Sequence, residues 1–331
     1  MLLSRTPRAH EPSPPSGLNR KVRSLFDRGI SLTPDNNQAR LPFFELDDHV
    51  EPVEADPVVV SMPTGPVAAS DGLPARLIKP HSLEKFDRHR KYCTIFNNVN
   101  NGMKNRWPNN RGYLELFAAT GLAVVDEDQL EVDACPLLAA QAAFNRLAFV
   151  EFNPTLAAAL ERRFLDRGVS PDRARVFCGD ANDPRVLAEA LAFLPDPGLT
   201  FTFIDPEDIN GHWDAIRFLG SRRRQRIDFL VNLPIGSMKR NYTSKAITAV
   251  LGTDAWEPRV KAGEPLGLVF RETLAAQFHR IGFQVAEHME VRAFGNQTPV
   301  YDLVFASRNP QAIDFWRKIQ KINPYGQRQL F

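Results

Sequence analysis

The chain has 331 residues, of which 43% are hydrophobic and 24% are charged, a balance typical of globular proteins. No apolar run approaches the roughly 20 residues that a membrane-spanning helix needs, which argues against an integral membrane protein. Lys and Arg number 41 against 39 Asp and Glu, so a net charge of +2 makes no whole-chain case for nucleic acid or a membrane surface. Any such surface has to be local.

The three cysteines, Cys93, Cys135 and Cys178, lie far apart and form no CxxC pair. This spacing fits neither a zinc module nor a disulfide framework, so we expect a reducing compartment. The first residues, MLLSRTPRAHEP, carry arginines and prolines where a signal peptide has an apolar stretch. We therefore expect a cytoplasmic protein.

Residues 1–81 are expected to form a largely disordered arm, because residues 1–80 hold 12 of the 26 prolines. Two apolar pieces, LPFFEL at 41–46 and PVVVSM at 57–62, leave open an arm or an added edge strand packed on the main domain. The next segment, from Ser82 to about Asn105, has apolar residues at helical spacing between basic residues. It predicts an amphipathic helix with a basic outer face, either solvated or binding nucleic acid.

Short apolar runs then alternate with helical stretches up to residue 308. Strands are expected at 112–119, 146–152, 174–180, 199–205 and 226–234. The alternation favours an α/β fold with a doubly wound, mostly parallel sheet. A helix and two strands near the end of this domain (82–308) indicate a C-terminal antiparallel hairpin, and residues 309–331 are expected to form a helical tail.

Ligands of doubly wound sheets bind beyond the carboxyl ends of the strands, so the loops there are the candidate site. The first strand runs into a turn of small residues, Phe117 to Gly121, that lets a ligand approach the backbone. Glu151 ends the second strand and is placed to accept hydrogen bonds from ribose hydroxyls. Asp180 follows the third strand and is placed to accept from an exocyclic amine, whereas Asp183 is expected to cap the next helix.

This order of a turn and two acids resembles the class I S-adenosylmethionine-dependent methyltransferases. The blocks FVEFNP, GDAND, FIDP with Trp213 downstream, VNLPIGSMKRN and YDLVFASRNP are similar, in that order, to the three-Cys-motif partner proteins, a bacterial family with a methyltransferase-like domain. The likeness covers about residues 83–320. It implies the cofactor S-adenosylmethionine and a partner, a separate three-cysteine protein resembling radical S-adenosylmethionine enzymes. The cofactor-binding residues implied are Glu115, Phe117, Ala119, Gly121, Glu151, Asp180 and Ala181.

The chain departs from the family pattern at several positions. Ala119 stands where the family has the first glycine of an FAGxG turn, and an alanine there is strained if its φ is positive. Glu115 replaces the usual Asp of the first strand, and Glu207 and Asp208 replace the Phe-Gly that normally follows Pro206. The aromatic that would stack on a flat substrate ring is missing.

The fourth and fifth strands carry the expected catalytic and substrate-binding residues. Asp205 and Pro206 stand where the resembling enzymes keep a catalytic acid, and His212 is placed to accept a proton. Substrate contacts are expected from Trp213 and from Lys239 and Arg240, which meet a phosphate-bearing substrate if the acceptor is nucleic acid. The basic run at residues 222–226 lies at the opposite sheet edge and is expected to be a solvated helix end.

The sequence thus predicts methyl transfer from S-adenosylmethionine to an unidentified acceptor. One alternative is an adaptor that keeps the fold, has lost the chemistry and binds a three-cysteine protein. Another is a nuclease accessory holding Mg²⁺ with Asp205, Glu207 and Asp208. The histidines have no metal-ligand spacing, and the lack of a GxSxG elbow argues against a hydrolase.

Overall fold

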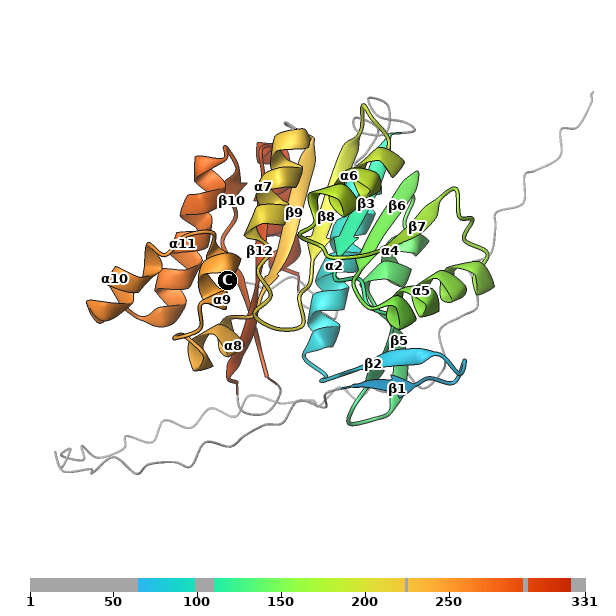
Figure 1. Ribbon diagram of the computed structural model, residues 1–331, viewed down its shortest axis with the longest axis horizontal. Helices are drawn as coiled ribbons and strands as arrows, with labels where there is room; N and C mark the ends of the chain where they lie inside the picture. The colour runs from blue at the N-terminus through green and yellow to red at the C-terminus, as the bar shows by residue number, and fades with distance from the viewer. Residues whose placement is uncertain (1–64, 99–109, 224–225, 294–296, 323–331) are drawn as a thin grey trace, which may run out of the picture. The chain divides into compact units, whose positions relative to one another are not determined.

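The computed structural model describes residues 65–98, 110–223, 226–293 and 297–322, all within one compact unit, Ser61–Phe331. Its main sheet has the strand order β10-β12-β9-β8-β3-β6-β7 (Figure 1). Strand β11 pairs with β12. The strands are β3 (Arg111–Leu116), β6 (Arg146–Glu151), β7 (Ala174–Cys178), β8 (Leu199–Ile204), β9 (Ile227–Leu233), β10 (Gln284–Val285), β11 (Met289–Arg292) and β12 (Pro299–Ser307). Five neighbouring strands, in the order β7-β6-β3-β8-β9, are parallel to one another. Strand β12 is antiparallel to β9, β10 and β11.

Apolar side chains alternate between the two faces of this sheet, and helices cover both. Tyr113 and Phe203 belong to the core on one face, beneath α2 (Ser82–Asn98), α4 (Cys135–Gln141), α5 (Pro154–Asp166) and α12 (Pro310–Gln320). Leu114 and Ile204 belong to the other, beneath α6 (Pro184–Phe193), α7 (Trp213–Arg222), α8 (Ile235–Arg240), α9 (Ala246–Leu251) and α11 (Leu266–Arg280). Helix α10 (Trp256–Lys261) packs on α11. The predicted doubly wound, mostly parallel sheet with an antiparallel C-terminal hairpin is confirmed.

A second sheet has four strands, ordered β1-β2-β4-β5. Its strands are β1 (Pro66–Ala68), β2 (Pro74–Ile78), β4 (Leu122–Val125) and β5 (Leu130–Asp133). Residues 65–81, which the sequence assigned to the arm, therefore include two strands, and β2 pairs in parallel with β4. Strands β1 and β2 each begin at a proline, and the first position of a strand tolerates proline. The high proline content therefore did not prevent strands here, and the prediction of disorder was wrong for these residues. The remaining arm, including 41–46 and 57–62, lies outside the described residues.

Arg163 of α5 holds the β1–β2 hairpin in place. Its guanidinium donates to both carboxylate oxygens of Asp71, at 2.8 and 3.0 Å, and to the carbonyl oxygens of Leu73 and Pro74. The same group donates to the carbonyl oxygen of Thr120, in the loop after β3, at 2.9 Å. One buried side chain thus joins the hairpin, α5 and the predicted cofactor loop.

Helix α2 is confirmed, but two of its basic residues do not lie on the outer face that the sequence predicted as solvated or binding nucleic acid. Lys85 and Arg88 are only 3% and 2% exposed. Arg88 donates to the carbonyl oxygen of Ile319 at 2.7 Å and to that of Ile322, which ties α2 to α12. The predicted end of the helix, near Asn105 to Pro108, lies outside the described residues. None of the helices in the described ranges has the length and apolar character of a membrane span.

Candidate functional site

The strand order reverses between β3 and β8, and this point defines the candidate site. The chain passes outward from β3 through β6 to β7 and then returns to β8 on the other side of β3. In such sheets the loops beyond the carboxyl ends of the strands separate there and leave a crevice for ligands. The register pairs Glu115 with Phe149 and Glu151 with Cys178, so the loops that follow β3, β6 and β7 all leave the same edge of the sheet.

The loop after β3 has an unusual backbone. Phe117, Ala119 and Gly121 have φ of 63°, 52° and 76°, all in the left-handed region. Gly121 is required there, because a Cβ at this position would lie 2.7 Å from Cδ1 of Leu160. Ala119 has the positive φ that the sequence analysis identified as strained. Strand β3 consequently ends at Leu116, three residues before the predicted end.

Glu151 is 8% exposed and faces this loop. One carboxylate oxygen accepts a hydrogen bond from the backbone N–H of Ala119 at 2.7 Å, and the other accepts from the N–H of Asn153 at 2.8 Å. A carboxylate has about four lone-pair directions, so these two bonds leave one on each oxygen. Glu151 thus ends β6 and faces the loop after β3, at the position where the sequence placed the ribose-binding acid.

Asp180 lies at the same edge and is exposed. One of its oxygens accepts from the N–H of Asn182 at 2.8 Å, and the side chain of Asn182 donates to the carbonyl oxygen of Gly211 at 2.7 Å. These bonds join the loops that follow β7 and β8. Ala181 is buried in the core, and Asp183 caps α6 by accepting from the N–H of Arg185 at 2.8 Å, as expected.

Asp205, the expected catalytic acid, is bound into a buried ion pair. Its two oxygens accept from Nζ of Lys85 at 2.7 and 2.6 Å, and one also accepts from Nδ2 of Asn232 at 2.7 Å. Burial raises the pKa of Asp205, but the charges of Lys85 and Arg76 and these hydrogen bonds outweigh it and lower the pKa below its usual value. Asp205 is therefore ionised and a poor proton acceptor. Lys85, 120 residues away, was missed because no local pattern links it to Asp205.

The acids near Asp205 do not converge on a metal ion. Glu207 pairs with Nε of Arg76 at 2.9 Å and is 62% exposed, whereas Asp205 is 6% exposed at its side chain and neutralised by Lys85. Within the described ranges no group of three or more His, Cys, Asp or Glu side chains is arranged to hold a metal ion. The Mg²⁺-binding interpretation of Asp205, Glu207 and Asp208 is therefore wrong.

Glu115 lies below the loop, among buried side chains. It is 2% exposed and accepts from the hydroxyl of Tyr113 at 2.6 Å, and that hydroxyl lies 2.8 Å from Nε2 of His89. Burial raises the pKa of Glu115 well above its usual value, although the bond from Tyr113 opposes this. The hydroxyl of Tyr113 thus joins Glu115 to His89 of α2, and the carboxyl of Glu115 does not reach the surface of the crevice.

His212 and Trp213 are core residues, which corrects their expected roles. His212 is fully buried, its Nδ1 lies 2.9 Å from the carbonyl oxygen of Asn210, and burial lowers its pKa to about 4. Trp213 is 6% exposed and packs edge-on against Phe278 with ring centroids 5.4 Å apart. His212 precedes the first residue of α7, Trp213, and Trp213 is part of the apolar core between this helix and the sheet. Pro206 is also buried.

Lys239 and Arg240 lie in the last turn of α8, which follows β9 at the carboxyl edge. They are therefore at the edge where the sequence placed them. The other basic run, at 222–226, is not simply a solvated helix end. Arg222 is exposed, but Arg223 is 5% exposed and donates to the carbonyl oxygens of Pro195 and Leu191 at 2.7 and 2.9 Å.

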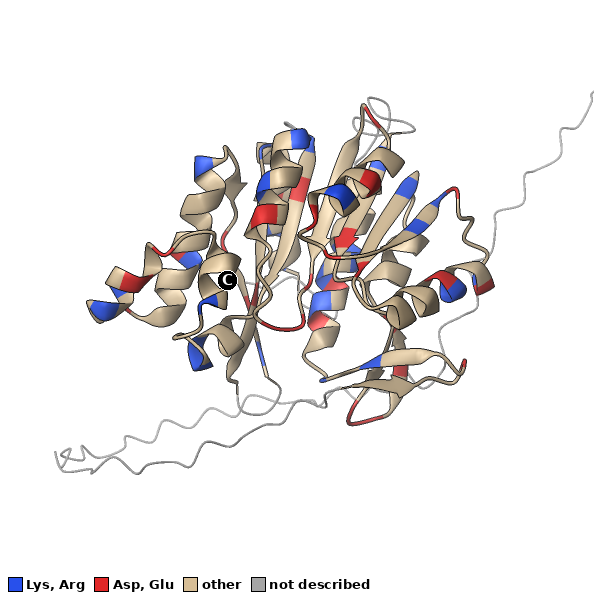
Figure 2. Cartoon of the chain, in the orientation of Figure 1, with Lys and Arg blue, Asp and Glu red and all other residues tan. Residues whose placement is uncertain are grey.

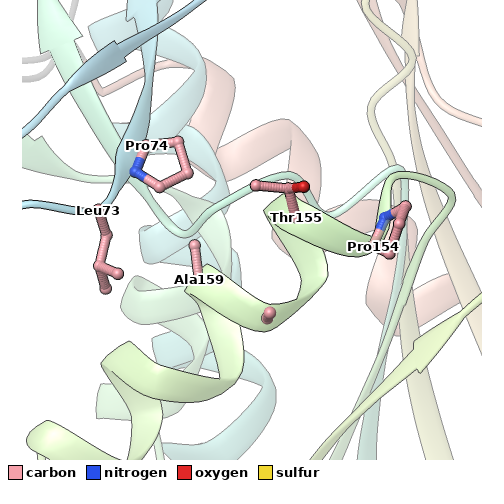
Figure 3. A pocket seen from close by; sticks show the side chains of 6 residues that line it. Leu73, Pro74, Pro154, Thr155 and Ala159 are labelled. Atoms are coloured by element: carbon pink, nitrogen blue, oxygen red, sulfur yellow. The ribbon is translucent and has the colours of Figure 1, made fainter.

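An open, mostly apolar depression of about 460 Å³ lies beside the candidate crevice (Figure 3). It is formed by the β1–β2 hairpin and the first turns of α5, and its lining consists of Leu73, Pro74, Pro154, Thr155, Ala158 and Ala159. None of these residues carries a charge. The depression therefore lacks the carboxylates that the nucleoside site requires, and we do not assign the cofactor to it.

No protein-family model and no curated protein matches the chain. Among solved structures, it is similar to a DUF519 family protein of Legionella pneumophila, at 12% identity over 70% of this chain and 89% of that one, with a TM-score of 0.41. A Klebsiella pneumoniae protein assigned to the O-methyltransferases gives 11% identity over 70% and 90% of the two chains, and a TM-score of 0.39.

An O-methyltransferase from neocarzinostatin biosynthesis, solved with S-adenosylmethionine and a naphthoic acid, gives 15% identity over 69% of this chain and 58% of that one, and a TM-score of 0.31. Likenesses of this extent assign no function to the present chain. Its function has to be inferred from its own site.

Proposed function

We propose that the protein binds S-adenosylmethionine at the carboxyl edge of β3, β6 and β7 and transfers its methyl group to an acceptor. The observation that carries this proposal is the position of Glu151. Its carboxylate is held by two backbone N–H groups, at 2.7 and 2.8 Å, and keeps a lone pair on each oxygen for the two vicinal hydroxyls of a ribose. Exposed Asp180, two residues beyond β7, supplies an acceptor for the exocyclic amine of adenine.

The bound cofactor supplies an electrophilic methyl group on a sulfonium, so the protein's main contribution is to hold the reactants in line. Glu151 and the loop at 117–121 hold the nucleoside part of the cofactor. Asp205 is ionised and hydrogen-bonded to Lys85 and Asn232, so its role is to order the fourth-strand loop and not to remove a proton. Buried His212 does not serve as the base. The acceptor thus has to be a nucleophile that needs no deprotonation by these two side chains before it attacks.

Calorimetric titration with S-adenosylmethionine tests the cofactor site. We expect the wild-type protein to bind and Glu151→Gln to bind roughly 10-fold to 150-fold more weakly, because hydrogen bonds to a charged group contribute about 1.5–3 kcal/mol. Glu161→Gln, an exposed position on α5, is the matched control and should bind like the wild type. No heat of binding and no thermal shift for the wild type in excess cofactor would refute the proposal.

A second candidate is an adaptor that binds a three-cysteine protein and performs no chemistry. The ion pair that neutralises Asp205 and the alanine at the left-handed position 119 favour it, because both depart from what catalysis at this edge needs. Co-purification with such a protein, together with no transfer of a labelled methyl group in the presence of that partner, would support the adaptor. Transfer of the label to any acceptor would exclude it.

A further inference from the structure

From Phe229, within the fifth parallel strand β9, to Thr253, the chain runs for 25 residues without an acidic residue. This stretch contains α8, the turn after it and α9, and it carries three cations, Lys239, Arg240 and Lys245. Because α8 follows β9 directly, this helix starts at the same edge of the sheet as the loops with Glu151 and Asp205. Figure 2 shows Lys and Arg colour on α8 at this edge.

The three cations have no acidic partner within the described ranges. Neighbouring arginines are neutralised: Arg259 pairs with Glu264 and Glu272, and Arg271 with Glu290 and Asp302. By contrast, within the part of the chain that the structure describes, the side chains of Lys239, Arg240 and Lys245 make one hydrogen bond, from Arg240 to the hydroxyl of Ser237 at 3.2 Å. A local surplus of three positive charges therefore remains in a protein whose net charge is only +2.

Lys239 also faces the start of α11. Its Nζ lies 2.9 Å from the position that a Cβ on Gly267 would occupy, and the first turn of α11 contains no acidic side chain. Between Arg240 and Lys245, the aromatic side chain of Tyr242 is 45% exposed. Asn241, Thr243 and Ser244 complete a turn of small polar residues around it. Unneutralised cations interleaved with an exposed aromatic ring are the side chains that bind single-stranded nucleic acid, through phosphates and base stacking.

We propose that residues 239–245 bind single-stranded nucleic acid and present it to the carboxyl edge as the methyl acceptor. We call these residues the α8–α9 basic turn. The role of the nucleic acid as methyl acceptor rests on the proposed methyl transfer, whereas binding of the nucleic acid does not depend on the cofactor. Phosphate groups neutralise Lys239, Arg240 and Lys245, and Tyr242 stacks on a base without selecting a sequence.

Fluorescence anisotropy with labelled 20-nucleotide RNA and DNA strands of mixed sequence measures this binding. Three phosphate contacts predict a slope of log affinity against log salt of about −2, so raising the salt from 50 to 200 mM should weaken binding roughly tenfold to twentyfold. In the triple variant Lys239→Ala, Arg240→Ala, Lys245→Ala this slope should fall close to zero. Tyr242→Ala should keep the slope and weaken binding roughly fivefold or more.

A triple variant of three exposed cations elsewhere, Arg222→Ala, Lys318→Ala and Lys321→Ala, is the charge-matched control and should bind like the wild type. The proposal is overturned if the control loses as much affinity as the α8–α9 variant, if the wild type binds neither strand, or if it binds only anionic lipid vesicles. Glu151→Gln separates the two proposals: we expect it to bind S-adenosylmethionine more weakly, to the extent given above, and to bind the oligonucleotide like the wild type. Failure of cofactor binding in the wild type with oligonucleotide binding intact would refute methyl transfer alone.

Discussion

Ala119 carries a methyl group at a φ of 52°, a conformation that glycine adopts without strain. Its N–H is held there by Glu151, so the loop keeps this conformation despite the cost. We expect Ala119→Gly to raise the free energy of unfolding by up to about 1 kcal/mol, because relief of strain exceeds the entropy that glycine adds to the unfolded chain. Urea denaturation measures this, and calorimetry should show S-adenosylmethionine binding at least as tight as in the wild type.

The same exchange at an ordinary position gives the control for this prediction. Ala158→Gly, on the exposed side of α5, should lower stability by roughly 0.5–1 kcal/mol, as glycine does inside helices. If both variants are destabilised equally, Ala119 is not strained.

Removing one partner of the buried ion pair between Lys85 and Asp205 should destabilise the protein strongly. Lys85→Met leaves the carboxylate of Asp205 buried, 6% exposed, without its nearest cation, which typically costs about 3–5 kcal/mol. Adding Asp205→Asn to that variant should recover part of the loss, because a neutral amide needs no cation. Chemical denaturation of the two single variants and the double variant gives their coupling energy. Arg90→Met, 53% exposed on the same helix, should change stability by less than about 0.5 kcal/mol.

The residues of the site were only partly predictable from the sequence. Glu151 and Asp180 lie at the carboxyl edge, as the sequence predicted, because Glu151 ends β6, Asp180 lies two residues beyond β7, and the carboxyl ends of parallel strands meet at one edge. Lys85 was expected on a basic outer face, either solvated or binding nucleic acid, because helical periodicity shows which residues share a face and not what that face contacts. His212 and Trp213 look like loop residues in sequence, and only the packing of α7 onto the sheet shows that they are buried.

At the scale of elements, the small sheet is joined to the candidate site through Arg163. Arg163→Met removes donors from three carbonyl oxygens and from Asp71, and we expect a loss of roughly 2–3 kcal/mol. Hydrogen exchange should speed up in the ladder between β2 and β4 and stay unchanged in the ladder between β8 and β9. Arg162→Met, 65% exposed on the same helix, is the neighbouring control and should leave both ladders as they are. Equal acceleration in both ladders would show that Arg163 does not act locally.

Strands β3, β6, β7, β8 and β9 were predictable within three residues at each end, because buried parallel strands are short, continuous apolar runs between turn residues. Strands β1 and β2 were missed for the opposite reason. They are short, partly exposed and rich in proline, so they depend on β4 and on Arg163 for their structure and have no strong pattern of their own.

For the molecule as a whole, buried histidines make stability fall in acid. The pKa of His212 is lowered to about 4 by burial, against about 6.5 in an unfolded chain, so between these values the unfolded state binds a proton that the folded state does not. Stability contributed by neutral His212 is present above pH 6.5 and is lost as the pH falls to 4, at most about 3 kcal/mol. Asp228, whose pKa burial raises to about 6, acts in the opposite direction.

Comparison with His212→Gln isolates the histidine's contribution. Urea denaturation gives the free energy of unfolding of both proteins at pH 7 and at pH 4.5. Between these two pH values, this free energy should fall by roughly 2–3 kcal/mol less in the variant than in the wild type. Exposed His279→Gln should follow the wild type. Parallel pH curves for wild type and His212→Gln would show that the folded protein protonates this ring as readily as the unfolded chain does.

The attachment of the β1–β2 hairpin sets a practical limit on how this protein can be shortened. A gene fragment beginning at Ser82, where the helical and strand patterns start, would encode a chain without Asp71, Leu73 and Pro74. Of its four partners, the guanidinium of Arg163 would then keep only Thr120. Strand β4 would lose its parallel neighbour β2. Expression trials should therefore place the first codon upstream of Gly65.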